Sequence, residues 1–172
     1  GLIGSMHWPP SRSAADRLIT RIWPRVRAQV PSARLLVAGW NADRYLSAHL
    51  DTPGLELRAD VPHPRDFFSQ VGVMVYAPSR GSGMKIKVME AMAFGVPVVT
   101  TAEGIEGLAA EPGIHAHVAD DDGVMADHVV GLLRDRAAAE RMRQAARALI
   151  VDDYNPRVVV DQMLDVYREV AG

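Results

Sequence analysis

The chain has 172 residues, of which 48% are hydrophobic and 23% charged, and its formal net charge is −2. This length suits one domain with a substantial core. Because no excess of basic residues is present to neutralise phosphates, a general nucleic-acid-binding function is excluded. The chain has no cysteine, which excludes a disulfide framework and a thiolate metal site and fits the reducing cytoplasm.

Nothing in the chain resembles a membrane or secretion segment. Its longest apolar runs fall far short of the roughly 20 residues that cross a bilayer. The opening GLIGSMHWPP lacks the basic start and apolar run of a signal peptide. It begins directly with a strand-like run, so we expect a piece of a longer protein.

Short apolar runs alternate with longer amphipathic segments along the chain. The first half is expected to contain strand 2–6, helix 13–29, strand 33–39, helix 42–50, strand 55–59 and helix 64–71. The second half is expected to contain strand 73–78, helix 84–94, strands 97–101 and 114–119, and helices 122–135, 137–150 and 156–170. Pro24 lies inside the first helix and should kink or break it.

Apolar strands separated by helices indicate a parallel sheet that is covered on both faces. The pattern predicts an α/β fold, a Rossmann-like doubly wound sheet of about six parallel strands flanked by helices, in a single domain 1–172. In such a sheet, ligands bind beyond the carboxyl ends of the strands.

A glycine-rich loop lies at this edge of the predicted sheet. Gly81 and Gly83 fall between strand 73–78 and helix 84–94. Their flexible backbone, followed by the free N–H groups of a helix start, is suited to holding a phosphate.

Two lysines, Lys85 and Lys87, follow this loop at a helix start, where basic residues are mildly unfavourable. A bound phosphate would give them a role, and positions two apart do not share a helix face, so we favour Lys87. Glu90 shares the face of Lys87, and its carboxylate is suited to sugar hydroxyls. We assign Lys87 and Glu90 as the catalytic candidates of a sugar-nucleotide site. The open alternative is a solvated surface ion pair.

Other polar motifs have plainer interpretations. Asp120–Asp122 precede a helix, where acidic residues cap N–H groups, so we prefer capping to a metal-binding D-x-D. His115 and His117 alternate along a strand with no third ligand at a metal-site spacing, and we treat them as structural. His7 follows the first strand and is interpreted as a loop residue with its own partners.

Methionines and tryptophans near the predicted edge are ambiguous. Met84, Met89 and Met92 are interpreted as core packing. Trp8 and Trp40 both follow strands, where they would stack on a base or sugar, or pack against another part of the protein. An NAD(P) site is rejected because the first strand lacks the second and third glycines of G-x-G-x-x-G.

The segment GSGMKIKVMEAMAFGVPVVTTAEGIEGL (81–108) resembles the donor-binding segment of group 1 (family 4) glycosyltransferases of GT-B fold. EAMAFGVPVV is its most specific part. The resemblance continues in LIGSMHWPPSRSAA, WPRVRAQVPSARLLVAG and YNPRVVVDQMLDVYREV, and so covers essentially the whole chain. It implies the C-terminal, nucleotide-sugar-binding half of a retaining enzyme, without the N-terminal acceptor half.

The resemblance also implies roles for particular residues. Glu90 matches the second glutamate of the family's E-x7-E pattern, which holds the donor ribose. The first glutamate, which contacts the sugar, falls at Ser82, a departure that also allows a non-catalytic nucleotide-binding module. The donor-binding residues implied are Gly4, Ser5, Ser82, Gly83, Met84, Lys85, Lys87, Glu90, Thr101, Glu103 and Gly104.

The resemblance further implies a nucleoside-diphosphate sugar as donor substrate and no metal or other cofactor for the chemistry. The loops around 39–45 and 60–63 are expected to surround the base. The partners are then the donor and the acceptor-binding domain, with peripheral membrane association of the full-length enzyme left open. The isolated domain is expected to be inactive.

Overall fold

The computed structural model describes residues 1–79 and 83–171, in which strands and helices alternate. The strands of this part of the chain are β1 (Leu2–Ile3), β2 (Leu35–Ala38), β3 (Leu55–Arg58), β4 (Met74–Tyr76), β5 (Val98–Thr100) and β6 (His117–Val118). The α-helices are α1 (Pro9–Arg17), α2 (Trp23–Gln29), α3 (Ala42–Tyr45), α4 (Pro64–Phe68), α5 (Ile86–Ala93), α6 (Asp122–Arg134), α7 (Arg136–Asp153) and α8 (Pro156–Ala171).

All the strands pair in parallel, in two groups of three that are ordered β1-β2-β3 and β4-β5-β6. Backbone hydrogen bonds join the groups, because the Gly1 amino group donates to the Val73 carbonyl at 2.7 Å and the Val75 N–H donates to the Gly1 carbonyl at 2.9 Å. The spatial order is therefore β3-β2-β1-β4-β5-β6, which is that of the doubly wound dinucleotide-binding fold. The predicted fold class is confirmed.

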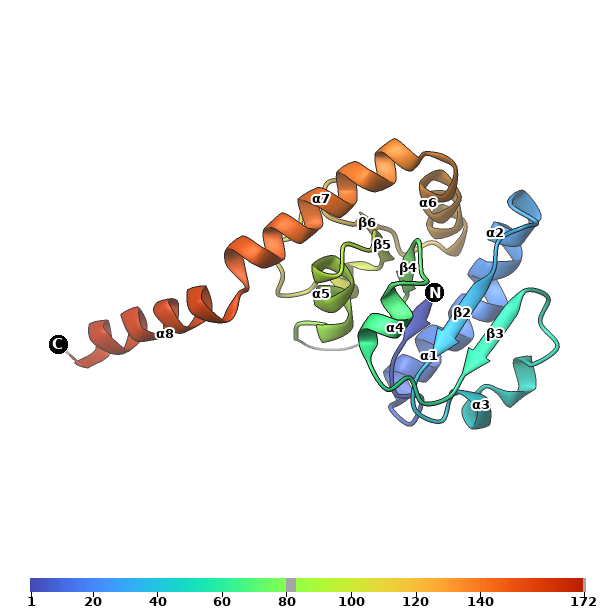
Figure 1. The fold of residues 1–172 in the computed structure, drawn as a ribbon, viewed down its shortest axis with the longest axis horizontal. Coiled ribbons are helices and arrows are strands. Elements are labelled where there is room, and N and C mark those ends of the chain that lie inside the picture. The colour runs from blue at the N-terminus through green and yellow to red at the C-terminus, as the bar shows by residue number, and fades with distance from the viewer. Residues whose placement is uncertain (80–82, 172) are drawn as a thin grey trace.

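Helices cover both faces of the sheet. α2 packs against α6 on one face, and α5 packs against α7 on the other. α8 projects away from the rest of the molecule (Figure 1), and its side chains are largely exposed. None of the described helices is both long and apolar enough to cross a membrane. The core between the layers fully buries large side chains, including Leu2, Ile22, Phe67, Val98 and Met125.

The first helical region differs from the prediction at its start and matches it at its break. α1 begins at Pro9, before the expected residue 13, because two prolines are well tolerated in the first turn, where N–H groups need no helical partner. A π-helical turn, Leu18–Ile22, separates α1 from α2. Pro24 lies in the first turn of α2, so its missing N–H accounts for the interruption.

The first and last strands are shorter than predicted. β1 ends at Ile3, although the Met6 N–H still donates to the Trp40 carbonyl at 3.1 Å. β6 covers only His117–Val118, because the chain at Gly113 turns to donate its N–H to the Ala116 carbonyl at 2.7 Å. The chain leaves β1 early at Gly4, where the predicted ligand edge begins.

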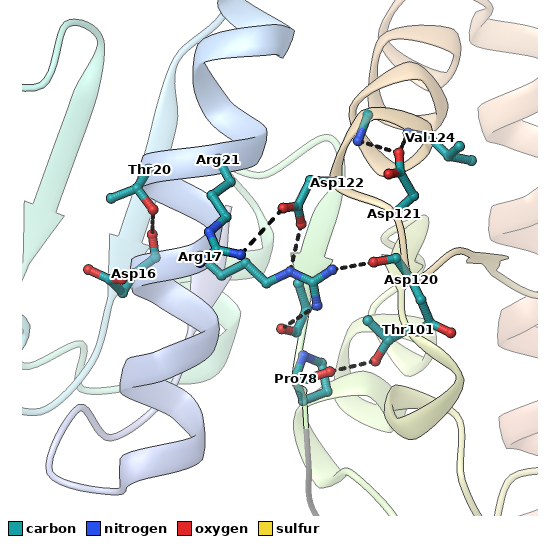
Figure 2. A network of polar contacts seen from close by, with 12 residues as sticks. Asp16, Arg17, Thr20, Arg21, Pro78, Thr101, Asp120, Asp121, Asp122 and Val124 are labelled. Atoms are coloured by element: carbon teal, nitrogen blue, oxygen red, sulfur yellow. Dashed lines mark hydrogen bonds and ion pairs between the residues drawn. The ribbon is translucent and has the colours of Figure 1, made fainter.

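Arg17 connects three elements around the joint between the two groups of strands (Figure 2). From α1, its Nε donates to the Asp122 carboxylate at 2.6 Å, and its other nitrogens donate to the Ala77 and Asp120 carbonyls. Asp121 accepts from the N–H groups of Gly123 and Val124, and these hydrogen bonds lower its pKa. The acidic run therefore caps and anchors α6, as the capping interpretation predicted.

Candidate functional site: a cleft at the carboxyl ends of the strands

A cleft of about 490 Å³ opens beyond the carboxyl ends of β1, β2 and β3. Its wall is completed by the starts of α4 and α5. The lining residues are Ile3, Gly4, Ser5, Gly39, Trp40, Asp60, Val61, Pro62, Pro64, Ile86, Lys87 and Glu90. The cleft thus lies at the edge where the fold places ligands. Another cavity, of about 240 Å³, lies at the opposite ends of the strands, around Gly1 and Val73, and has a mainly apolar lining.

The floor of the cleft is bare backbone. A Cβ added at Gly39 would lie 2.1 Å from the Gly4 carbonyl oxygen, and Gly39 has a φ of +125°. A Cβ at Gly4 would lie 3.0 Å from the Nζ of Lys87. Gly39 therefore requires glycine, whereas a side chain at Gly4 would press on the flexible end of Lys87.

Lys87 reaches across this floor from the first turn of α5. Its Nζ donates to the Ser11 hydroxyl at 2.6 Å and lies 4.3 Å from the centre of the Tyr76 ring. Ser11 is buried in α1. The ammonium group is therefore held on one side by a hydroxyl and an aromatic face and faces the cleft on the other.

Burial controls the electrostatics of the pair Lys87 and Glu90. It lowers the pKa of Lys87 to about 8, against a smaller opposing effect of the Glu90 carboxylate. Burial also raises the pKa of Glu90, opposed by the charge of Lys87. Burial thus disfavours the charged form of each group, and a bound anion would favour the charged form of Lys87.

The start of α5 adds backbone donors to the same wall. The N–H groups of Val88 and Met89 both donate to the Lys85 carbonyl, at 2.8 and 3.2 Å. Those of Ile86 and Lys87 precede them in the first turn and have no helical acceptor. Ile86 and Lys87 both line the cleft, so this helix start is suited to anion binding.

Lys85 has a separate environment. Its Nζ forms an ion pair with the Glu106 carboxylate at 3.2 Å and donates to the Gly83 carbonyl. Only 10% of its side chain is exposed. Lys85 thus fastens the turn at the start of α5 to the loop after β5, and it does not line the cleft.

Other candidate residues lie around the cleft rather than in its lining. Ser82, together with Gly81, lies outside the described residues. Gly83 has a left-handed backbone, with φ of +72°, which suits its place in the loop. Met84 is 51% exposed and packs beside Gly107, so it is not core packing as predicted.

The candidates after β5 do not line the cleft. The Thr101 hydroxyl is buried and donates to the Pro78 carbonyl at 2.9 Å. Gly104 packs so tightly against Thr100 that a Cβ there would overlap the Thr100 hydroxyl. Glu103 is partly exposed in the same short 3₁₀ turn, Ala102–Gly104.

The remaining polar candidates have structural partners. His7 shares a 3.1 Å hydrogen bond with the Tyr45 hydroxyl. His115 accepts from the Glu111 N–H at 2.9 Å, and His117 stacks on His128 with 4.2 Å between ring centres. Among the described residues, no three metal-ligating side chains come together.

Sequence reasoning did not identify Ser11 or Tyr76 as site residues, and it placed Asp60 only within the loop 60–63 that was expected to surround the base. Ser11 and Tyr76 come from an early helix and a buried strand, and no local pattern connects them to Lys87. Asp60 had a detectable signal, because it follows β3 at the predicted ligand edge. Its φ of +50° is a conformation that residues with side chains rarely adopt.

A sheet in this strand order, with a ligand cleft at its carboxyl edge, defines a doubly wound α/β domain of the nucleotide-binding type. The particular family follows from the sequence. The model of the family described as "Glycosyl transferases group 1" matches residues 1–135, and the chain belongs to this family. A search of curated protein sequences finds no match.

Solved structures confirm the fold. TarM of S. aureus, in complex with fondaparinux, α-GlcNAc-glycerol and UDP, has a TM-score of 0.82 and 19% identity, over 97% of this chain and 34% of TarM. Anabaena HepE, in complex with UDP and glucose, has a TM-score of 0.73 and 11% identity, over 97% of this chain and 48% of HepE.

A single-domain structure is also similar. The C-terminal domain of the group 1 glycosyl transferase LpcC from Francisella tularensis has a TM-score of 0.71 and 14% identity, over 91% of this chain and 84% of that one. This chain therefore spans about a third of TarM and half of HepE, but most of the LpcC domain. The GT-B architecture expected from the sequence is supported.

Proposed function

We propose that the chain is the donor-binding domain of a retaining hexosyltransferase, which moves a sugar from a nucleoside-diphosphate sugar to an acceptor hydroxyl. The observation that carries this proposal is the position of Lys87. Its ammonium group lies beside Gly4 and Ser11 on the cleft floor, next to the first turn of α5 and the Glu90 carboxylate. Family membership and the UDP complexes of the similar proteins support it.

In this proposal the diphosphate lies over Gly4 and Ser5. Backbone donors at the start of α5 and the ammonium group of Lys87 neutralise its charge, and no metal ion takes part. Among the described residues that line the cleft, Lys87 is the one cation, whereas Lys85 is already paired with Glu106. Lys85 therefore supports the binding loop without neutralising the diphosphate.

Glu90 then accepts hydrogen bonds from the ribose hydroxyls, since its carboxylate lies one helical turn from Lys87 on the same wall. The base lies further along the cleft, between Trp40 and the segment from Asp60 to Pro64. Gly83, Met84, Thr101, Glu103 and Gly104 contribute only through the shape of the neighbouring loops. This arrangement retains the predicted site with Lys87 and Glu90 as its centre.

Transfer with retention follows from attack of the acceptor on the face that the leaving group vacates. The bond between the anomeric carbon and the diphosphate oxygen breaks, and its electron pair remains on the diphosphate. The acceptor oxygen bonds to the anomeric carbon on the face that the diphosphate leaves, and its proton passes to the leaving phosphate oxygen. Lys87 and the helix start stabilise the charge as it develops, which is electrostatic catalysis.

The acceptor site belongs to a further domain in this proposal, because the similar enzymes TarM and HepE are two to three times as long as the matched region. The isolated domain binds the donor weakly and transfers little or no sugar. We place the full-length enzyme in the cytoplasm, which suits a chain without cysteine.

Calorimetric titration tests the proposal. UDP, GDP, ADP and their monophosphates are titrated into the wild-type chain, Lys87→Ala, Glu90→Ala and, as a matched lysine control, Lys85→Ala. Loss of a charge-assisted hydrogen bond costs about 1.5–3 kcal/mol, or about ten- to a hundredfold in affinity. We expect Lys87→Ala to weaken diphosphate binding by this amount, monophosphate binding less, and Lys85→Ala to have a smaller effect.

A deoxynucleotide isolates the role of Glu90. For the nucleotide that binds, the 2′,3′-dideoxy form should lose affinity in the wild type and lose nothing further in Glu90→Ala. Equal losses in both proteins would show that Glu90 does not contact the ribose. If a nucleotide binds but full-length enzyme shows no transfer, the chain is a non-catalytic binding module instead.

A further inference from the structure

A second group of side chains lies next to the cleft, and apart from Trp40 it has no role in the proposed donor site. It contains His7 after β1, Arg12 in α1, Trp40 after β2, and Arg44 and Tyr45 in α3, and is called here the arginine–aromatic cluster. Trp40 belongs to both sites, because it also lines the cleft.

The rings of the cluster are fixed in place by mutual contacts. The His7 Nδ1 lies 3.1 Å from the Tyr45 hydroxyl, and its ring packs edge-on against Trp40 with 5.7 Å between centres. Tyr45 lies 6.2 Å from His7, centre to centre. The three rings therefore form one ordered aromatic surface.

Two positive charges converge on this surface. The guanidinium carbons of Arg12 and Arg44 lie 5.0 and 5.9 Å from the centre of the same Tyr45 ring. Across the described residues, neither arginine forms an ion pair with a carboxylate. An anionic ligand at this surface would meet two guanidinium groups that have no carboxylate partner among the described residues.

The carboxylates on the same elements have other partners. Asp43, beside Arg44, accepts from the Arg44 backbone N–H at 2.8 Å. Asp16, one helical turn after Arg12, pairs with His49 at 2.9 Å. Neither carboxylate forms an ion pair with the guanidinium group of Arg12 or Arg44 in the described part of the chain.

Exposed tryptophan completes the surface. Trp40 is 56% exposed and the nearby Trp8 is 62% exposed, although indole rings are mostly buried in folded proteins. Flat aromatic faces pack against the C–H faces of sugar rings. Guanidinium groups bind carboxylates and phosphates through paired hydrogen bonds.

We propose that the arginine–aromatic cluster binds an anionic saccharide, a sugar that carries a carboxylate or a phosphate ester. Through Trp40 the bound saccharide adjoins the donor cleft. That the saccharide forms a distal part of the acceptor rests on the proposed function. That the cluster binds the saccharide does not. An apolar protein partner fits less well, because it would bury two uncompensated cations.

Titration of the whole chain with four sugars tests the proposal. Trigalacturonate and glucose 6-phosphate carry the two kinds of anion, and maltotriose and glucose are neutral controls. We expect at least one anionic sugar to bind at least tenfold more tightly than its neutral counterpart, with affinity falling as NaCl is raised. The anionic sugar that binds more tightly shows whether the site recognises a carboxylate or a phosphate ester.

Variants locate the site. Arg12→Met and Arg44→Met should each weaken binding of the anionic sugar by about tenfold, as loss of one charged hydrogen bond does. Arg168→Met, on exposed α8, is the matched control and should not change it. Neither Arg12 nor Arg44 lines the donor cleft, so nucleotide titration of the same variants verifies their fold and tests the donor site separately.

Three results would overturn the proposal. One is equal affinity for anionic and neutral sugars. Another is unchanged anionic-sugar binding in both Arg12→Met and Arg44→Met. The third is inorganic phosphate binding as tightly as the better anionic sugar, which would define a simple anion site. Loss of nucleotide binding alone would count against the donor site and leave the saccharide site intact.

Discussion

At the scale of single residues, the two neighbouring lysines have opposite environments. Lys87 is held against Ser11 and Tyr76 at the cleft, whereas Lys85 is paired with Glu106 away from it. Burial lowers the pKa of Lys87 to about 8, so folding disfavours its charged form. A buried lysine at a helix start therefore lowers the stability of the fold, and in the proposed function its charge binds an anion.

The pH dependence of donor binding should reflect this pKa. A bound diphosphate favours the charged form, so binding near pH 8 should take up about half a proton and affinity should fall as pH rises through 8. The measurement is calorimetry with a nucleoside-diphosphate sugar, whose esterified phosphates do not titrate there, in two buffers of different ionisation enthalpy. Lys87→Arg, which stays charged, should bind without this proton uptake.

Stability should change in the opposite direction to binding. Because its pKa is lowered, the charged Lys87 destabilises the fold below about pH 8. This destabilisation decreases as pH rises from 8 toward the pKa of lysine in the unfolded chain. Lys87→Met should therefore melt at a higher temperature than wild type at pH 7. An unchanged or lower melting temperature would show that the contacts to Ser11 and Tyr76 outweigh the burial cost.

At the scale of elements, α6 depends on its cap. Asp121 accepts two N–H groups of the first turn, and these lower its pKa. Asp121→Ala should lower the melting temperature at pH 7 by a few degrees, whereas Asp121→Asn, whose side-chain oxygen also caps, should change it little. Because the pKa of Asp121 in the folded state lies below its ordinary value, the difference in melting temperature between wild type and Asp121→Ala should vanish only as pH falls through that lower pKa. Equal melting temperatures of Asp121→Ala and Asp121→Asn at pH 7 would contradict a capping role for Asp121.

Elements with a local signal were predictable from the sequence. The break near Pro24 and the separation of Lys85 from Lys87 follow from proline geometry and helical periodicity. The early start of α1 at Pro9 was not predicted, although proline is well tolerated in a first helical turn. The partners of Lys87 were missed because Ser11 and Tyr76 come from other elements, and only tertiary packing brings them to α5.

At the scale of the whole molecule, Arg17 connects the two groups of strands. It reaches from α1 to the Asp122 carboxylate and to two carbonyls beyond β4 and β6. The pair is mostly buried, with 17% and 16% of the side chains exposed. Loss of the ion pair between Arg17 and Asp122 should therefore weaken the connection between the two groups of strands.

Arg17→Met should destabilise the fold by about 1.5–3 kcal/mol, because it leaves a partly buried carboxylate without its main partner. For a chain of this size that corresponds to a fall of roughly 4–10 °C in melting temperature. Asp122→Asn and the double variant complete a cycle. Additive losses would show that the two side chains do not act together.

The bare floor of the cleft has a consequence for how this domain can evolve. Gly39 admits no side chain because Gly4 lies against it, and Gly4 leaves the space that Lys87 occupies. Substitution is thus less restricted on the walls, at Trp40, Asp60 and Pro64, than at Gly39. In the proposed function, descendants of this sequence can acquire a preference for a new base through these walls while the floor under the diphosphate is retained.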